Sequence, residues 1–246
     1  MKSRWIMGKN CLKEVLALSQ ERIIQVLLSQ RGSSLCALCK EKKISYRLVS
    51  EQTLTHLACS DSHQGCIAQV KEHSFPAVKT FLRELDALSS SLVLMCDGIM
   101  DPQNFGSILR AAECFGVDGV IWSKNRGVSL TPVVSKVSVG ASELVPLIQV
   151  SNLFETLRLF QDKGYQVVAT VSDKESPSLY SFSFSSRVLL IIGSEDRGIQ
   201  PLLKKKADHL LRIPMRGKVE SLNVAQAMTA CLTVWAYQRL EACEIH

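Results

Sequence analysis

Apolar runs of strand length alternate with amphipathic stretches of helix length through most of this chain of 246 residues. Beyond residue 90 the runs predict strands at 91–96, 119–122, 145–150, 166–171, 187–192 and 209–213. The intervening stretches predict helices at 105–115, 131–139, 153–163, 199–206 and 222–243. Strands that alternate with helices form a mostly parallel sheet with both faces covered. The sequence therefore predicts an α/β fold.

The first third of the chain repeats this alternation in shorter pieces. It predicts helices at 11–18, 33–43 and 52–58, and strands at 23–28, 44–49 and 65–70. Pro76 and the serines at 89–91 mark a linker that carries a helix over 78–88. We expect a small α/β domain over residues 1–75, a linker over 76–90 and a larger α/β domain over 91–246.

The positive charge is concentrated in the first of these domains. The chain has a net charge of +6, and residues 1–75 hold 11 lysines and arginines against 6 acidic residues. The remainder is close to neutral. This asymmetry is equally consistent with a part that binds a polyanion and with a merely basic surface.

The cysteines indicate neither disulfides nor a metal. Nine cysteines lie at irregular spacing, and the one CxxC pair, Cys36 and Cys39, lacks a second pair or a histidine at zinc spacing. No apolar run approaches the roughly 18 residues that a membrane span needs, and residues 1–12 lack a signal-peptide core. We expect a cytoplasmic, reduced protein without membrane contact or metal.

Motifs of the common nucleotide enzymes and hydrolases are missing from the sequence. There is no GxGxxG after a strand, no GxxxxGK[ST], no GxSxG and no HExxH. Dinucleotide binding of the ordinary kind, P-loop chemistry, esterase chemistry and zinc proteolysis are therefore not indicated.

Three polar loops follow predicted strands instead, at 101–110, 193–198 and 214–224. Loops after buried parallel strands meet at one edge of the sheet, so we interpret the three as one composite site. Gly193 and Gly198 allow close backbone approach or positive φ. Ser221 is expected to be the N-cap of the last helix, with Asn223 in its first turn, which would leave amide groups for an anion. The three loops together could bind an adenosine-type ligand, although each glycine taken alone is more typical of a plain turn.

Two side chains of the first loop are candidates for contacting a substrate. Asn104 lies in the loop, and Arg110 follows six residues later on the helix predicted over 105–115, which otherwise looks buried. Arg110 could form an ion pair with Glu113 or Glu195, or it could hold a phosphate through two parallel hydrogen bonds.

On these residues the chain resembles the SpoU/TrmH family of RNA ribose 2′-O-methyltransferases in the SPOUT superfamily. The likeness is strongest to the bacterial subgroup that methylates a guanosine ribose in 23S ribosomal RNA. Its three motifs match residues 104–110, then Gly193, Glu195 and Gly198, then 214–217 with 221–224, and His63-Gln64-Gly65 matches a signature of the N-terminal domain. Ala225 departs from the serine of many relatives.

The resemblance implies a fold, a cofactor and roles for residues. The larger domain would be a SPOUT trefoil knot, and the small domain an RNA binder like those of ribosomal proteins. S-adenosylmethionine would be bound by Gly193, Ile213, Leu222, Ser221, Asn223 and Glu195. The catalytic set would be Arg110, Asn104, Glu195, Ser221 and Asn223, with Asn104 and Arg110 on the RNA. The family works as a homodimer without a metal.

We expect the basic N-terminal domain to bind RNA. The candidate side chains are Lys9, Arg31, Lys40, Lys42 and Lys43. Ribosomal RNA is favoured over transfer RNA as the substrate. A transfer-RNA ribose methyltransferase and a non-catalytic RNA-binding assembly factor with the same fold stay open as alternatives.

Overall fold

The computed structural model describes residues 2–219 and 221–244, which form two compact units. The first unit consists of Met1–Ser74, Phe105–Arg110 and Ser129–Leu144. The second consists of Phe75–Asn104, Ala111–Val128 and Val145–His246. Each unit is thus built from three separate stretches of chain, and each is described by itself below.

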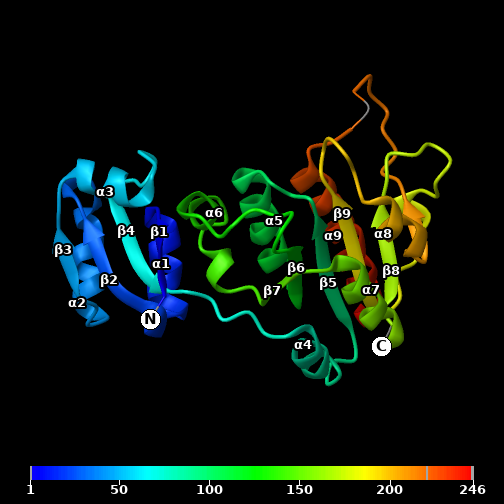
Figure 1. Cartoon of the computed structure of the whole chain (residues 1–246), viewed down its shortest axis with the longest axis horizontal. Coiled ribbons are helices and arrows are strands. Elements are labelled where there is room, and N and C mark those ends of the chain that lie inside the picture. Colours follow the sequence, from blue (N-terminus) through cyan, green and yellow to red (C-terminus); the bar gives the residue numbers. More distant parts are fainter. Residues whose placement is uncertain (1, 220, 245–246) are drawn as a thin grey trace. The chain divides into compact units, whose positions relative to one another are not determined.

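The first unit contains a mixed four-stranded sheet of order β1-β4-β2-β3 (Figure 1). Its strands are β1 (Ser3–Met7), β2 (Ile23–Leu28), β3 (Tyr46–Leu48) and β4 (Cys66–Lys71). Its helices are α1 (Lys9–Leu18), α2 (Cys36–Glu41), α3 (Glu51–Ala58) and α6 (Pro132–Val137), with short 3₁₀ turns at Gln20–Arg22, Gln30–Leu35 and Ala141–Glu143. Strands β1 and β2 both pair antiparallel with β4, and β3 pairs parallel with β2.

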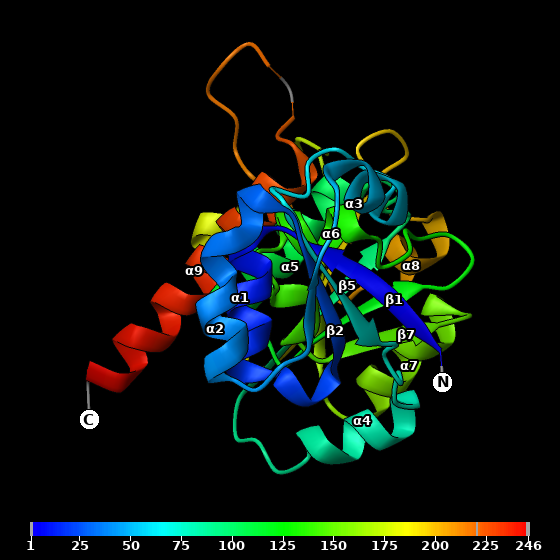
Figure 2. The same ribbon diagram turned by 90° about the vertical axis from the view of Figure 1, so that its left-hand side faces the viewer.

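Both faces of this small sheet are covered, as Figure 2 shows for α1 and α2 on one side and α3 on the other. Successive strand residues point to opposite faces, so Ile6 packs with Leu12 and Leu16 of α1, whereas Met7 packs with Leu54 of α3. Val133 of α6 also packs against the cluster that contains Met7 and Leu54.

The second unit contains a six-stranded sheet of order β10-β8-β9-β5-β6-β7 in which every neighbouring pair is parallel. Its strands are β5 (Ser91–Asp97), β6 (Gly119–Ser123), β7 (Leu147–Val150), β8 (Gln166–Thr170), β9 (Arg187–Gly193) and β10 (His209–Leu211). Its helices are α4 (Val78–Leu85), α7 (Leu153–Asp162), α8 (Pro201–Lys206) and α9 (Val224–Glu244), with a 3₁₀ turn at Leu179–Ser181. Helix α5 (Pro102–Cys114) contributes residues to both units.

Buried, mostly apolar strands form the core of this sheet. All seven residues of β5 are buried, which is typical of a parallel strand covered on both faces. Met95, Ile121 and Ile191 pack against Phe81 of α4 and Phe160 of α7 on one face, and α9 contacts β9. The chain runs outward from β5 through β6 to β7 and then returns to β8 on the other side. The carboxyl ends of β5 and β9 therefore form a switch point, where α/β proteins place ligand sites.

The structure confirms the α/β fold and the mostly parallel sheet, and it corrects several details. Strand β1 was not predicted. The helix expected over 33–43 is a 3₁₀ turn followed by α2, and the helix expected over 78–88 ends at Leu85. The N-cap of α9 is Asn223 and not Ser221, because the Asn223 side-chain oxygen accepts from the amides of Ala225 and Gln226 at 3.0 and 3.4 Å.

Over the described residues, no helix has both the length and the apolar character that crossing a bilayer requires.

Candidate functional site

One residue from each of the three polar loops meets at a single point in the second unit. The side-chain amide of Asn223 donates to Glu195 Oε1 at 2.6 Å and to Asn104 Oδ1 at 2.8 Å. Asn104 in turn donates to Glu195 Oε1 at 3.2 Å. The three segments, far apart in sequence, thus share one hydrogen-bonded triad of Asn104, Glu195 and Asn223.

The first amide of α9 also takes part, because the Val224 N–H donates to Glu195 Oε1 at 3.1 Å. The amino end of this helix was expected to hold an anion from a ligand. The anion at this helix end is instead the carboxylate of Glu195. It accepts a hydrogen bond from a backbone amide that has no partner within the helix. Glu195 is therefore fixed in place although its side chain is exposed.

The loop that carries Glu195 turns back tightly on itself between Gly193 and Gly198. Gly198 has φ of +63°, and its N–H donates to the carbonyl of Ser194 at 2.9 Å. A Cβ on Gly193 would lie 2.2 Å from the carbonyl carbon of Gly198. The close approach at Gly193 is thus to its own loop, and only a glycine permits it.

A cavity of about 720 Å³ opens on one side of this loop, at the carboxyl ends of β8, β9 and β10. Of the six residues predicted to bind a cofactor, five line it: Gly193, Glu195, Ile213, Ser221 and Leu222. Asn223 does not line this cavity and holds Glu195 instead.

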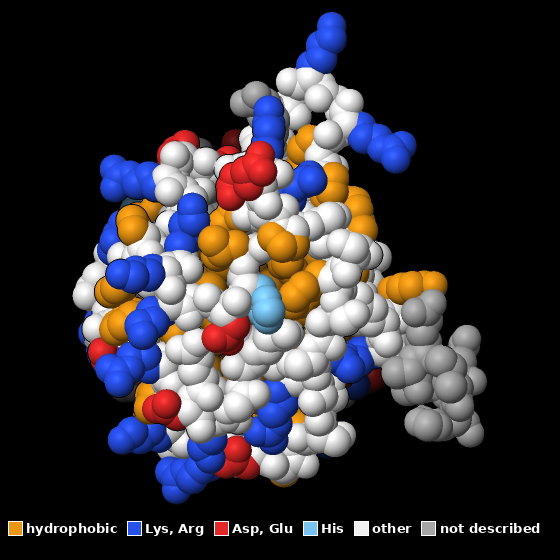
Figure 3. Space-filling model, turned by 90° about the vertical axis from the view of Figure 1, so that its right-hand side faces the viewer, with side chains coloured by type: hydrophobic (Ala, Val, Ile, Leu, Met, Phe, Trp, Pro, Cys, Tyr) orange, Lys and Arg blue, Asp and Glu red, His pale blue; other side chains and the backbone are white. Residues whose placement is uncertain are grey.

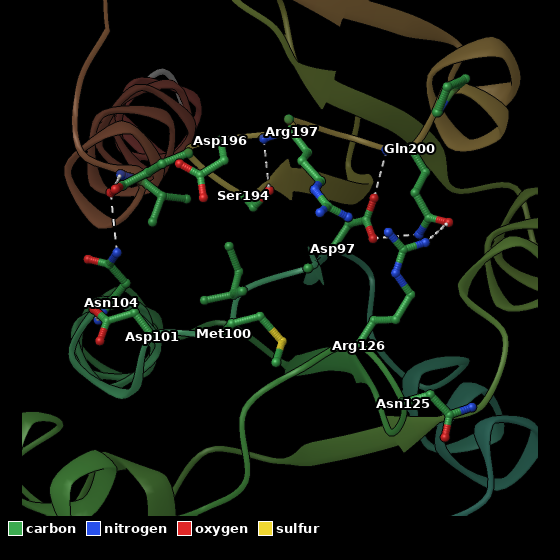
Figure 4. A pocket seen from close by; sticks show the side chains of 16 residues that line it. Asp97, Met100, Asp101, Asn104, Asn125, Arg126, Ser194, Asp196, Arg197 and Gln200 are labelled. Atoms are coloured by element: carbon green, nitrogen blue, oxygen red, sulfur yellow. Dashed lines mark hydrogen bonds between the residues drawn. The ribbon is translucent and has the colours of Figure 1, made fainter.

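A second cavity of about 620 Å³ lies on the other side of the loop, at the ends of β5, β6 and β9 (Figure 4). Residues Ser194–Gly198 and Val224 line both cavities, so they form the wall between them. Asn104 lines only the second cavity.

Arg110 lies on α5, six residues beyond Asn104, and its side chain is exposed. Among the described residues it has no carboxylate within 4.0 Å, so the structural ion pair with Glu113 or Glu195 is not formed. The guanidinium is left available for a phosphate or another anion.

The candidate RNA-binding residues divide between two ends of the small sheet. Arg31 follows β2 and Lys9 follows β1, next to the start of β4; the Lys9 N–H donates to Gln64 at 2.9 Å. Lys40, Lys42 and Lys43 precede β3, whose start lies beside the middle of β2. The five residues therefore do not form one cluster.

Several residues of the two cavities were not predicted. Thr170 and Val171 at the end of β8 line the first cavity, and Asp97, Arg126 and Gln200 line the second. The rule that places ligands at the carboxyl ends of strands could have identified Thr170, Val171 and Asp97. No pattern in the sequence indicated that Arg126 and Gln200 would lie at this cavity.

The cysteines give no indication of a site. The eight whose side chains are described are all free, and burial raises the pKa of the Cys66 thiol to about 11 and of Cys96 to about 12, which makes these thiols unreactive. No group of three histidine, cysteine, aspartate or glutamate side chains suited to a metal occurs in the described part of the chain.

Comparison with known proteins bears directly on this site. Residues 91–233 match the SpoU rRNA methylase family, and residues 5–76 match the family described as RNA 2′-O ribose methyltransferase substrate binding. The first match covers all three polar loops.

Individual relatives agree with the family matches. The 23S rRNA (guanosine-2′-O-)-methyltransferase RlmB of Shewanella oneidensis is 37% identical over 239 residues, which cover 95% of this chain and 97% of that protein. A putative RNA methyltransferase of the TrmH family from Porphyromonas gingivalis is 25% identical with a TM-score of 0.75, over 95% of this chain and 89% of that one. The SpoU methyltransferase AviRb of Streptomyces viridochromogenes, solved with AdoMet, has the same fold: its TM-score is 0.80 at 22% identity, over 97% of this chain and 91% of AviRb.

Proposed function

Because this chain belongs to the SpoU rRNA methylase family, we propose that it methylates the ribose 2′-hydroxyl of a guanosine in 23S ribosomal RNA, with S-adenosylmethionine as the donor. The observation that carries the proposal is the triad of Asn104, Glu195 and Asn223. Each member comes from a different family motif, and the triad lies between two cavities, one for a donor and one for an acceptor.

The first cavity has the chemistry that the donor needs. Its volume is within the range of sites for small ligands, and Ile192, Ile213 and Leu222 provide an apolar lining for an adenine ring. The carboxylate of Glu195 in its wall would attract the positively charged sulfonium of the donor. Arg212 and Lys218 would pair with the carboxylate of the donor's methionine part. When bound, S-adenosylmethionine supplies an electrophilic methyl group.

The residues of this chain would then position the acceptor and stabilise charge. Asn104 and Glu195 would orient the ribose hydroxyl, and Ser221 would line the donor side. We assign Arg110 to an RNA phosphate and to the developing alkoxide, because an arginine stays protonated in most sites and is a poor base. Holding both reactants in line would supply much of the rate.

The remaining organisation follows the family. We propose that residues 1–75 bind RNA, that 76–90 form a linker, and that 91–246 form the catalytic domain, in agreement with the two matched ranges. We also propose a cytoplasmic homodimer that needs no metal.

Exposed apolar side chains support the homodimer. Tyr180 is 63% and Tyr237 59% exposed, although both are large apolar residues. Figure 3 shows apolar side chains near the centre of one face, with a histidine and acidic side chains beside them and lysines and arginines further out.

The test is methylation of total RNA from a strain that lacks the gene, followed by mapping of the methylated nucleotide. A methylated guanosine ribose in 23S rRNA is expected. Methylation of transfer RNA alone would favour the transfer-RNA alternative. Calorimetry with S-adenosylmethionine addresses the non-catalytic alternative, because a pure RNA binder would show no heat of cofactor binding.

A further inference from the structure

We propose that the second cavity receives the base of the target guanosine and that Arg126 recognises the N7 and O6 atoms of that base. This inference rests on the proposed function and adds the specificity-determining residue. Proteins that recognise RNA by sequence mostly target unstacked nucleotides, whose bases are splayed out and hydrogen-bonded on their edges. A pocket beside the ribose site can receive such a base.

The position of the cavity relative to the triad is the first argument. Asn104 and Glu195 line one side of it, where the ribose would lie. Figure 4 shows Arg126 and Asn125 on the opposite side, with Met100 between them and Asn104. A nucleoside with its sugar at Asn104 would therefore direct its base towards Arg126.

Arg126 is held in a defined position by a chain of hydrogen bonds. The Asp97 side chain, 1% exposed, accepts from the Gln200 backbone N–H at 2.7 Å and from its side-chain amide at 2.6 Å. Gln200 Oε1 then accepts from Arg126 Nη1 at 2.7 Å. Asp97 and Gln200 are thus positioning residues, and they act through the guanidinium.

The loop that carries Arg126 is itself tied down. The Ser123 hydroxyl accepts from the backbone amides of Asn125 and Arg126 at 3.2 Å each, and Trp122 donates to the carbonyl of Val128 at 3.2 Å. A Cβ on Gly127 would lie 2.7 Å from Trp122, so the turn is too tight for a side chain there. The backbone that carries the guanidinium is therefore fixed as well.

The charge of the cavity favours a neutral base over a phosphate. Four carboxylates line it, Asp97, Asp101, Glu195 and Asp196, against two guanidinium groups, those of Arg126 and Arg197. A phosphate would be repelled by this excess of negative charge. Met100 is 62% exposed at the cavity and offers an apolar surface on which a base can lie.

Guanine is the base that a fixed arginine selects. Its N7 and O6 are two adjacent acceptors that match the parallel N–H groups of a guanidinium, whereas adenine presents a donor beside N7. The guanidinium nitrogens other than Nη1 have no hydrogen-bond partner among the described residues and are free for this contact.

The test uses the full chain and two versions of the mapped RNA substrate, one with guanosine and one with 7-deazaguanosine at the target. Loss of one hydrogen bond should lower kcat/KM of the wild type about 5- to 10-fold on the deaza substrate. Arg126→Gln should act about 5- to 100-fold more slowly on guanosine and should no longer distinguish the two substrates. Arg126→Lys keeps the charge and can still donate to N7 or O6 but loses the fork, so it should keep only part of the discrimination.

Lys124→Gln is the matched control, since Lys124 is an exposed cation two residues away that does not line the cavity. It should discriminate as the wild type does. If the wild type methylates guanosine but treats both substrates alike, or if Arg126→Gln discriminates as strongly as the wild type, the inference is overturned and the proposed function stands. A wild type that methylates no ribosomal RNA would overturn the proposed function instead.

Discussion

The carboxylate of Glu143 is completely buried in the first unit, where it contacts Arg4, Arg22 and His73. It pairs with Arg4, lies 2.8 Å from Arg22 Nη1 and lies 3.5 Å from His73 Nε2. Burial raises the pKa of Glu143, but the hydrogen bond to His73 and the charges of Arg4, His73 and Arg22 outweigh it and lower that pKa from 4.5 to about 2. A change of this size corresponds to about 3 kcal/mol of stability at neutral pH.

We therefore expect Glu143→Gln to lower the free energy of unfolding by about 3 kcal/mol at pH 7, because it leaves buried guanidinium groups without their counter-charge. The contribution of a carboxyl with a lowered pKa is complete above pH 4.5 and is lost as the pH falls towards 2. The difference between wild type and variant should accordingly shrink below pH 4.5. Urea unfolding followed by circular dichroism at pH 7 and pH 3 measures both values.

Glu155→Gln is the matched control, since the pair of Glu155 with Arg158 is exposed at 3.9 Å, and its loss should cost at most about 0.5 kcal/mol. Equal urea midpoints for Glu143→Gln and wild type at pH 7 would refute the reasoning, as would a difference that does not depend on pH.

Four further outcomes are expected. Asn223→Ala should lower stability by about 1 kcal/mol, because α9 loses its N-cap, and should also slow methyl transfer; denaturant melts and a filter assay measure the two. Gly193→Ala should weaken S-adenosylmethionine binding about 10-fold by calorimetry, since the loop must shift away from the new Cβ. Arg110→Ala should reduce kcat about 100-fold while leaving cofactor affinity unchanged, and near-normal turnover would contradict its assignment. Lys9→Gln and Arg31→Gln should each reduce the salt slope of RNA binding by about 1, measured by titration against salt, whereas an unchanged slope would remove them from the RNA contact.

Much of the fold was predictable because parallel strands are buried on both faces. Their side chains are almost all apolar, so the runs at 92–96 and 188–192 stand out in the sequence. Strand β1 is an edge strand that begins with exposed Ser3, and its short apolar part, Trp5–Met7, carries no comparable signal.

The triad was predictable in outline for a topological reason. Loops that follow parallel strands meet at one edge, so Asn104, Glu195 and Asn223 could be assigned to one site without coordinates. The roles of the residues within the site could not be predicted. Whether Ser221 or Asn223 is the N-cap of α9 depends on the residue at which this helix begins. The trefoil knot implied by the resemblance stays a prediction.

Contacts between distant, singly occurring polar residues were not predictable. The chain from Asp97 through Gln200 to Arg126 and the cluster around Glu143 join residues that no periodic pattern connects. Charge along the sequence was also a poor guide to charge in space, because Lys40, Lys42 and Lys43 lie away from Arg31 despite their nearness in the sequence.

The discontinuous composition of the first unit has a consequence for biosynthesis. Its sheet is complete once residue 71 has been made, but Val133 and Glu143 belong to the same unit and are added much later. While the chain grows on a ribosome, Arg4 and Arg22 lack their shared ion-pair partner until Glu143 is translated, more than 100 residues after them. The amino-terminal part therefore emerges first but reaches its final structure only when residues 129–144 leave the exit tunnel.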